Sequence, residues 1–151
     1  MLKQKWESSW MGCRFAIAIL AVVSLLLCSC GSIAIDTDLA KKGVEQFHSQ
    51  LDAEQYAALY AAADSELHKL TSQDDFTKLL TAIHHKLGNV RQSNLRVWNT
   101  SWHTGQGTIV TLTYDTTFSA GSGSEEFLWH ISDNRALLYG YHINSTDLIE
   151  K

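Results

Sequence analysis

The hydrophobic pattern of this chain changes its period near Val90. Before that point apolar residues recur every three to four positions, as they do along one face of an α-helix. After it they alternate with polar residues, as they do on a half-buried β-strand. Because a run of helices followed by a run of strands builds separate layers, the switch predicts an α+β domain.

Three helices are predicted before the switch. The first covers 38–51, and the second covers 53–63, where Asp52 and Gln55 are spaced as in a capping box. The third follows the start signal at Ser72 and ends at Gly88, a residue suited to a left-handed cap. Residues 32–37 are expected to be a short tether, at most about 20 Å long when extended.

Four strands are predicted after the switch, in an antiparallel meander whose short turns are glycine-bearing or polar, at 104–107, 120–124 and 133–135. In the last hairpin a three-residue loop would pair Ser132 with Ala136, and so set Trp129 opposite Tyr139 and Phe127 opposite Tyr141. In the first hairpin Leu95 and Val97 compete with Trp98 and Trp102 for the inner face.

The expected fold class is therefore α+β, with N-terminal helices packed on one face of a curved four-stranded antiparallel sheet. Over most of 39–148 the chain resembles small bacterial lipoproteins with a cystatin-like or nuclear-transport-factor-2-like domain. The resemblance implies that a pocket lies between sheet and helices. It is carried by residues that indicate packing and turns. These are Phe47-His48, Leu51-Asp52, Tyr56, Tyr60, Asp75-Phe76, 84–88, 107–114, Glu126-Phe127, Gly140-Tyr141 and Ile143-Asn144.

The N-terminal segment has the layout of a secretory signal. Lys3, Lys5 and Arg14 precede an uncharged apolar run at 15–27, which small residues follow. As a helix this run would span only about 20 Å, less than the ~30 Å hydrocarbon layer. Export of the remaining chain is expected, with Met1 and Met11 as alternative translation starts.

The run ends in Leu27-Cys28-Ser29-Cys30-Gly31, which resembles the lipobox of bacterial lipoproteins. The resemblance implies a signal peptide at 1–29, a lipidated Cys30 followed by a tether to residue 37, and a single domain at 38–151. It also implies a lipid bilayer as partner, and an outer membrane facing the periplasm if the cell has two membranes. An uncleaved membrane helix at 15–35 is the alternative.

Cleavage before Cys30 would leave a mature chain of 122 of the 151 residues. It removes three of the 12 basic and one of the 16 acidic residues, which leaves 9 and 15 and a net charge of −6. This acidic balance argues against nucleic acid as a partner. Since all three cysteines lie at or before position 30, the domain is expected to fold without disulfides.

Candidate site residues are aromatic rather than catalytic. Four residues, which are expected to face inward, would line a ligand pocket or fill the core: Tyr114, Trp129, Tyr139 and Tyr141.

Histidines and acids are weaker candidates. His84 is expected to be packed and hydrogen-bonded, and it points away from the adjacent His85, so no zinc site and no cofactor are predicted. Asp115 and His130 are expected to share the solvated outer face.

Two function classes remain. The first is a non-enzymatic envelope lipoprotein that binds a small apolar or uncharged ligand or another envelope protein. The second is a small hydrolase or isomerase that uses a pocket between sheet and helices. The first is favoured because the predicted inner face offers no buried carboxylate or imidazole.

Overall fold

The structure, a computed structural model, describes residues 31–103 and 107–150. The predicted leader at 1–29, Cys30 and most of the first predicted turn lie outside the described residues. From Ile35 onward the chain forms one compact unit. None of the described helices is both long enough and apolar enough to cross a membrane.

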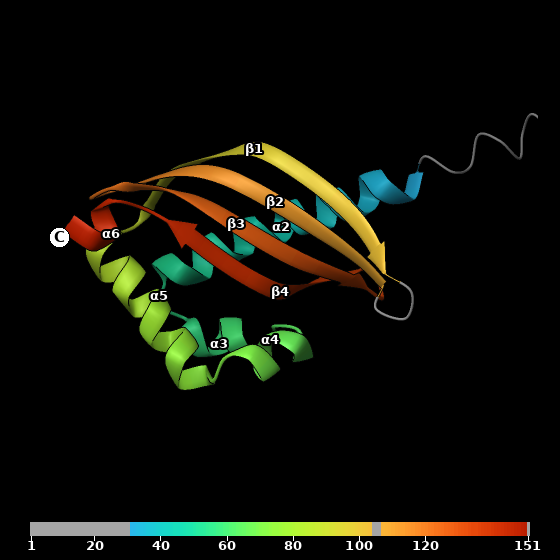
Figure 1. Ribbon diagram of the computed structural model, residues 1–151, viewed down its shortest axis with the longest axis horizontal. Coiled ribbons are helices and arrows are strands. Elements are labelled where there is room, and N and C mark those ends of the chain that lie inside the picture. Colours follow the sequence, from blue (N-terminus) through green and yellow to red (C-terminus); the bar gives the residue numbers. More distant parts are fainter. Residues whose placement is uncertain (1–30, 104–106, 151) are drawn as a thin grey trace, which may run out of the picture. The chain divides into compact units, whose positions relative to one another are not determined.

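Helices occupy the first part of the described chain and strands the second (Figure 1), so the predicted α+β class is confirmed. A short helix closes the chain. The elements in order are α2 (Gly31–Asp52), α3 (Tyr56–Ala61), α4 (Ser65–Leu70), α5 (Gln73–Leu87), β1 (Val90–His103), β2 (Gly107–Phe118), β3 (Ser122–Ser132), β4 (Arg135–Asn144) and α6 (Asp147–Glu150).

The helices differ from the predicted ones at the N-terminal side. Residues 31–37 are helical where a tether was expected, the second predicted helix corresponds to the shorter α3, and α4 forms where no helix was predicted. The capping box is wrong, because Asp52 Oδ1 accepts a hydrogen bond from the Val90 N–H (3.0 Å) and α3 has no side-chain cap. The third prediction is confirmed: Ser72 caps α5, and Gly88 ends it at φ 76°.

The four strands form one antiparallel sheet in the order β1-β2-β3-β4, which confirms the meander. The strands arc over α2 (Figure 1). Large side chains from this helix and from the inner face of the sheet meet in the core, where the rings of Phe47 and Phe127 lie 5.1 Å apart at 77°. Helices therefore cover one face of the sheet.

The predicted register of the last hairpin is partly wrong. Asp133 and Asn134 form a two-residue turn with φ 49° and 61°, so Ser132 pairs with Arg135 and Trp129 with Leu138. Positive φ at both central residues matches the strand twist, which favours this tight turn over the predicted loop. A bulge then restores the predicted pairing of Phe127 with Tyr141.

A bulge also resolves the first hairpin. Leu95 pairs with Tyr114, and after the shift Trp98 pairs with Leu112. Since Tyr114 and Leu112 are both buried on the inner face, the bulge lets Leu95 and Trp98 share that face although they are three residues apart.

Candidate functional site

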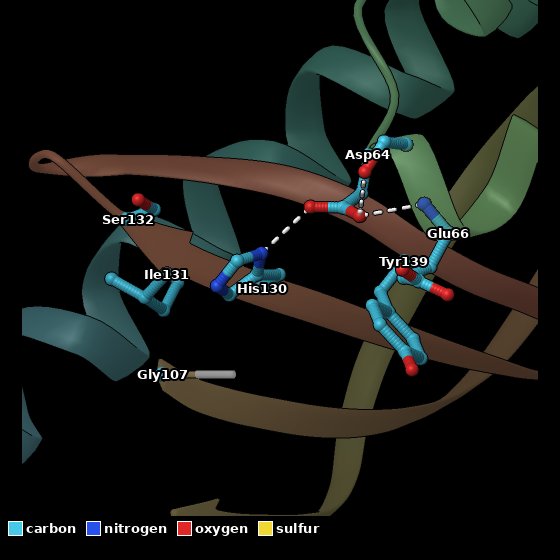
Figure 2. Close-up of a pocket in the computed structure, with 8 residues that line it drawn as sticks. Asp64, Glu66, Gly107, His130, Ile131, Ser132 and Tyr139 are labelled. Atoms are coloured by element: carbon cyan, nitrogen blue, oxygen red, sulfur yellow. Dashed lines mark hydrogen bonds and ion pairs between the residues drawn. The ribbon is translucent and has the colours of Figure 1, made fainter. Parts of the chain in front are cut away.

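A polar cleft of about 370 Å³ lies where β3 and β4 meet the start of α4 (Figure 2). Its volume falls within the usual range of small-molecule sites. The cleft is lined by Asp64, Ser65, Glu66, Gly107, His130, Ile131, Ser132 and Tyr139.

Asp64 is held in place by its role at the start of α4. It is the N-cap residue, and its Oδ1 accepts a hydrogen bond from the Glu66 backbone N–H at 2.8 Å. Its own backbone N–H donates to the Leu138 carbonyl on the edge strand β4 at 2.9 Å. These contacts fix the carboxylate of a residue that is only 5% exposed at the rim of the sheet.

His130 projects from β3 toward this carboxylate. The atoms His130 Nδ1 and Asp64 Oδ2 are 2.6 Å apart, and the dashed line in Figure 2 marks this contact. Burial by itself would raise the pKa of Asp64, but hydrogen bonds from Glu66 N–H and His130 outweigh it and hold that pKa below its ordinary value. Asp64 is therefore an ionised acceptor.

An ionised Asp64 determines which ring nitrogen of His130 carries the proton. A carboxylate can only accept, so Nδ1 is the protonated nitrogen, and the neutral ring keeps a lone pair on Nε2. Among the described residues, Nε2 makes no hydrogen bond. In its neutral form, the oriented imidazole would therefore offer one acceptor nitrogen to the cleft.

Gly107 leaves room beside that nitrogen. A Cβ atom placed on Gly107 would come within 2.9 Å of His130 Nε2, and the glycine has φ 81°, where other residues are strained. Any side chain at this position would therefore crowd the imidazole.

The charge of the lining limits what the cleft can hold. Asp64 and Glu66 supply carboxylates, and the described lining includes no lysine or arginine. Ser65, Ser132 and Tyr139 add hydroxyl groups, which both donate and accept hydrogen bonds. The site suits an uncharged or cationic polar molecule better than an anion.

A second polar cluster lies inside the core. Glu125, which is fully buried, accepts hydrogen bonds from the hydroxyls of Thr116 (2.5 Å) and Tyr141 (2.8 Å), and its Oε2 lies 2.8 Å from His48 Nε2. Burial first and the Glu125 charge second raise the pKa of Tyr141 well above its ordinary value. The expectation of an inner face without carboxylate or imidazole is therefore wrong.

Residues 43–141 match a protein family described as a protein of unknown function, DUF4019. The matched range contains both polar clusters and is more than half of the chain. The chain belongs to the DUF4019 family. A search of curated proteins finds no match.

In this DUF4019 domain the four predicted aromatic residues lie in different surroundings. Tyr139 lines the polar cleft, and Trp129 lines a separate cavity of about 50 Å³. Tyr114 is buried with its ring nearly perpendicular to that of Phe127, and Tyr141 donates to Glu125. The bulge that pairs Trp129 with Leu138 separates Tyr139 from the other inward residues.

Asp115 and His130, expected on the solvated outer face of the sheet, have different partners. Asp115 is exposed and lies 3.7 Å from the Arg96 guanidinium, whereas His130 contacts Asp64, 66 residues earlier in the chain. The sequence signal for Asp64 was its position as an N-cap aspartate before α4, a helix that was not predicted.

His84 is packed as expected, but its hydrogen bonding differs. Its Nε2 is buried without a partner among the described residues, and its Nδ1 lies 3.8 Å from Glu54 Oε1. No group of three His, Cys, Asp or Glu side chains in the described ranges is arranged to hold a metal ion.

Proposed function

We propose that this DUF4019 chain is a lipid-anchored domain of the bacterial envelope that binds a small polar molecule in the cleft at Asp64 and His130. One observation carries the binding function. An ionised, nearly buried aspartate orients an imidazole at 2.6 Å on the wall of a cleft large enough for a small ligand.

The ligand class follows from the lining. Hydroxyls, carboxylates and an imidazole acceptor favour a ligand that donates hydrogen bonds, such as a hydroxylated or amine-bearing molecule. The apolar ligand expected from the aromatic residues is less well suited, because three of the four aromatic side chains do not line this cleft.

Binding is tested by NMR on a form of the chain that begins at Gly31. Glucose, ethanolamine and inorganic phosphate serve as neutral, cationic and anionic probes, and the readout is the His130 imidazole resonance. We expect glucose or ethanolamine to shift this resonance and phosphate to leave it unchanged. A His130 signal that responds to none of the three, or to phosphate alone, would overturn the proposed ligand class.

Two glycine variants make the test specific to the cleft. Gly107→Ala places a methyl group against His130 Nε2 and should weaken probe binding at least about tenfold, the effect of a lost contact of about 1.4 kcal/mol. Gly140→Ala is the matched control, since its Cβ would meet Leu128 at an ordinary 3.7 Å. Equal binding by the two variants would contradict the proposed site.

The anchoring part of the proposal rests on the lipobox-like residues Leu27 to Gly31. Mass spectrometry of the full chain expressed in a bacterium with two membranes should find a mature protein that begins at Cys30 and carries acyl chains. A single acyl chain holds a protein at a membrane only marginally, so more than one acyl chain is expected. Detection of residues 1–29 on the mature protein would contradict this part.

The second candidate is a small hydrolase or isomerase, which the Asp64–His130 hydrogen bond favours because the same arrangement prepares a general base. In hydrolysis, Nε2 would take a proton from water as its oxygen bonds to an ester carbonyl carbon, and would return it to the leaving alkoxide. Turnover of p-nitrophenyl acetate that falls at least tenfold in His130→Gln would support this candidate. Equal rates would leave binding as the function.

A further inference from the structure

Two tryptophans on β1 are exposed to solvent. Trp98 is 51% and Trp102 is 68% exposed, whereas Trp129 on β3 is 5% exposed. Trp98 and Trp102 pair with Leu112 and Thr108 on the helix-covered face of the sheet, but the described helices leave these two side chains open. Large aromatic side chains that are exposed to solvent in this way often mark interaction surfaces.

Trp102 lies near the same end of the sheet as Ile35, the first residue of the compact unit. His48 contacts Glu125 and Gly43 lies against Trp129, so α2 runs antiparallel to β3. Trp129 pairs with Val110, and Val110 pairs with Thr100. Measured along the strand direction, Gly43 of α2 is therefore at the same position as Thr100 of β1.

Helix and strand geometry then give the level of Trp102. From Gly43 back to Ile35, α2 rises about 12 Å. From Thr100 on to Trp102, β1 advances about 7 Å in the same direction. Ile35, itself 55% exposed, and Trp102 therefore lie within about 5 Å of the same level along the sheet.

The distance from Cys30 to this end is short. Five residue steps separate Cys30 from Ile35, so their Cα atoms can be no more than about 18 Å apart. A lipid on Cys30 would therefore hold this end of the domain at the bilayer surface.

We propose that Trp102 inserts into the headgroup region of the bilayer that anchors Cys30, and that Trp98 lies further from it. The inference rests on the proposed lipid anchor. Indole combines a large apolar ring with one N–H donor, and tryptophan is enriched at membrane interfaces for this reason. Trp98 is four residues, or about 13 Å, further from this end of the strand.

Charge disfavours a second copy of the chain at this edge. β1 contains Arg91 and Arg96 and no acidic residue. Two β1 edges brought together would place four arginines in one interface, which costs free energy through like-charge repulsion. Arg96 and Arg91 lie further from this end of the strand than Trp98, so they bear on the pairing of two β1 edges and not on the contact with the bilayer.

The experiment uses full-length chain that a bacterial cell has processed, reconstituted into phosphatidylethanolamine–phosphatidylglycerol vesicles with brominated acyl chains. Three variants each keep one of Trp98, Trp102 and Trp129 and carry phenylalanine at the other two positions. We expect bromine to quench the fluorescence of Trp102 by about half or more, Trp98 clearly less, and buried Trp129 hardly at all. Mass spectrometry of the same samples reports whether Cys30 carries lipid.

The outcomes separate the two proposals. A lipidated protein whose Trp102 is quenched no more than Trp98 overturns the insertion of Trp102 and leaves the anchor intact. A protein without lipid on Cys30 overturns both. Trp102 that acrylamide cannot reach before vesicles are added, in a sample that sediments as a dimer, identifies a second copy as the occupant and likewise overturns the proposal.

Discussion

Replacing Tyr141 by phenylalanine removes one of the hydrogen bonds to a fully buried carboxylate. In the folded domain the Tyr141 hydroxyl donates to Glu125 Oε1 at 2.8 Å, while Thr116 and His48 contact the other oxygen. The ring itself packs against Phe47, with centroids 4.8 Å apart, and the substitution preserves this packing. The variant therefore isolates the hydroxyl.

The expected cost follows from the charge and burial of the acceptor. A hydrogen bond to a charged group contributes about 1.5–3 kcal/mol, and no water replaces a lost donor easily around a carboxylate with 0% exposure. We expect Tyr141→Phe to lower the free energy of unfolding by about 2 kcal/mol. With a urea dependence of about 2 kcal/mol per molar, the midpoint should fall by about 1 M.

Urea unfolding followed by circular dichroism measures this change on a form that begins at Gly31. Tyr139→Phe is the matched control, because the Tyr139 hydroxyl makes no hydrogen bond to a described residue and should cost less than about 0.5 kcal/mol. A loss below about 0.5 kcal/mol for Tyr141→Phe as well would refute the reasoning. It would mean that Glu125 does not depend on this donor.

Three further changes test the core, the acid behaviour and the cleft. Phe76→Ala and Leu112→Ala should each lower the free energy of unfolding by about 3 kcal/mol in urea titrations, since both side chains are buried; losses below about 0.5 kcal/mol at both would contradict their place in the core. Because the pKa of Asp64 is lowered by folding, its ionised carboxylate stabilises the folded state at pH values above its ordinary pKa near 3.8. This stabilisation is lost as the pH falls through the lowered pKa. Asp64→Asn keeps a good N-cap residue, so it should flatten the fall in stability below pH 4, and an unchanged acid limb would count against the ionised pair. Gly107→Ala, unlike Gly140→Ala, should reduce probe binding without unfolding the domain, as thermal melts would verify.

Local patterns were sufficient where the interactions are local. The start and end of α5 could be predicted because Ser72 caps its own helix, and because Gly88 needs no side chain to adopt φ 76°. The four strands and their order followed from the alternating pattern and the short turns between them. These features depend on neighbours within a few residues, which a sequence displays directly.

The hydrogen-bonded clusters depended on the tertiary structure. Glu125 stands beside Glu126 in a stretch that reads as polar, yet three side chains from α2, β2 and β4 surround it in the core. A buried carboxylate persists only when such partners satisfy it, and nothing in the local pattern shows that they will meet.

The cleft combines both levels. The sequence determines that Asp64 can start a helix and that His130 alternates with the inward Trp129. Only the folded chain decides that the loop before α4 bonds to the edge of β4, which brings the two side chains within 2.6 Å across 66 residues. The tight turn at Asp133 and the following bulge set the pairing register there. A shift of the register by one residue would turn each side chain of the strand to the opposite face of the sheet.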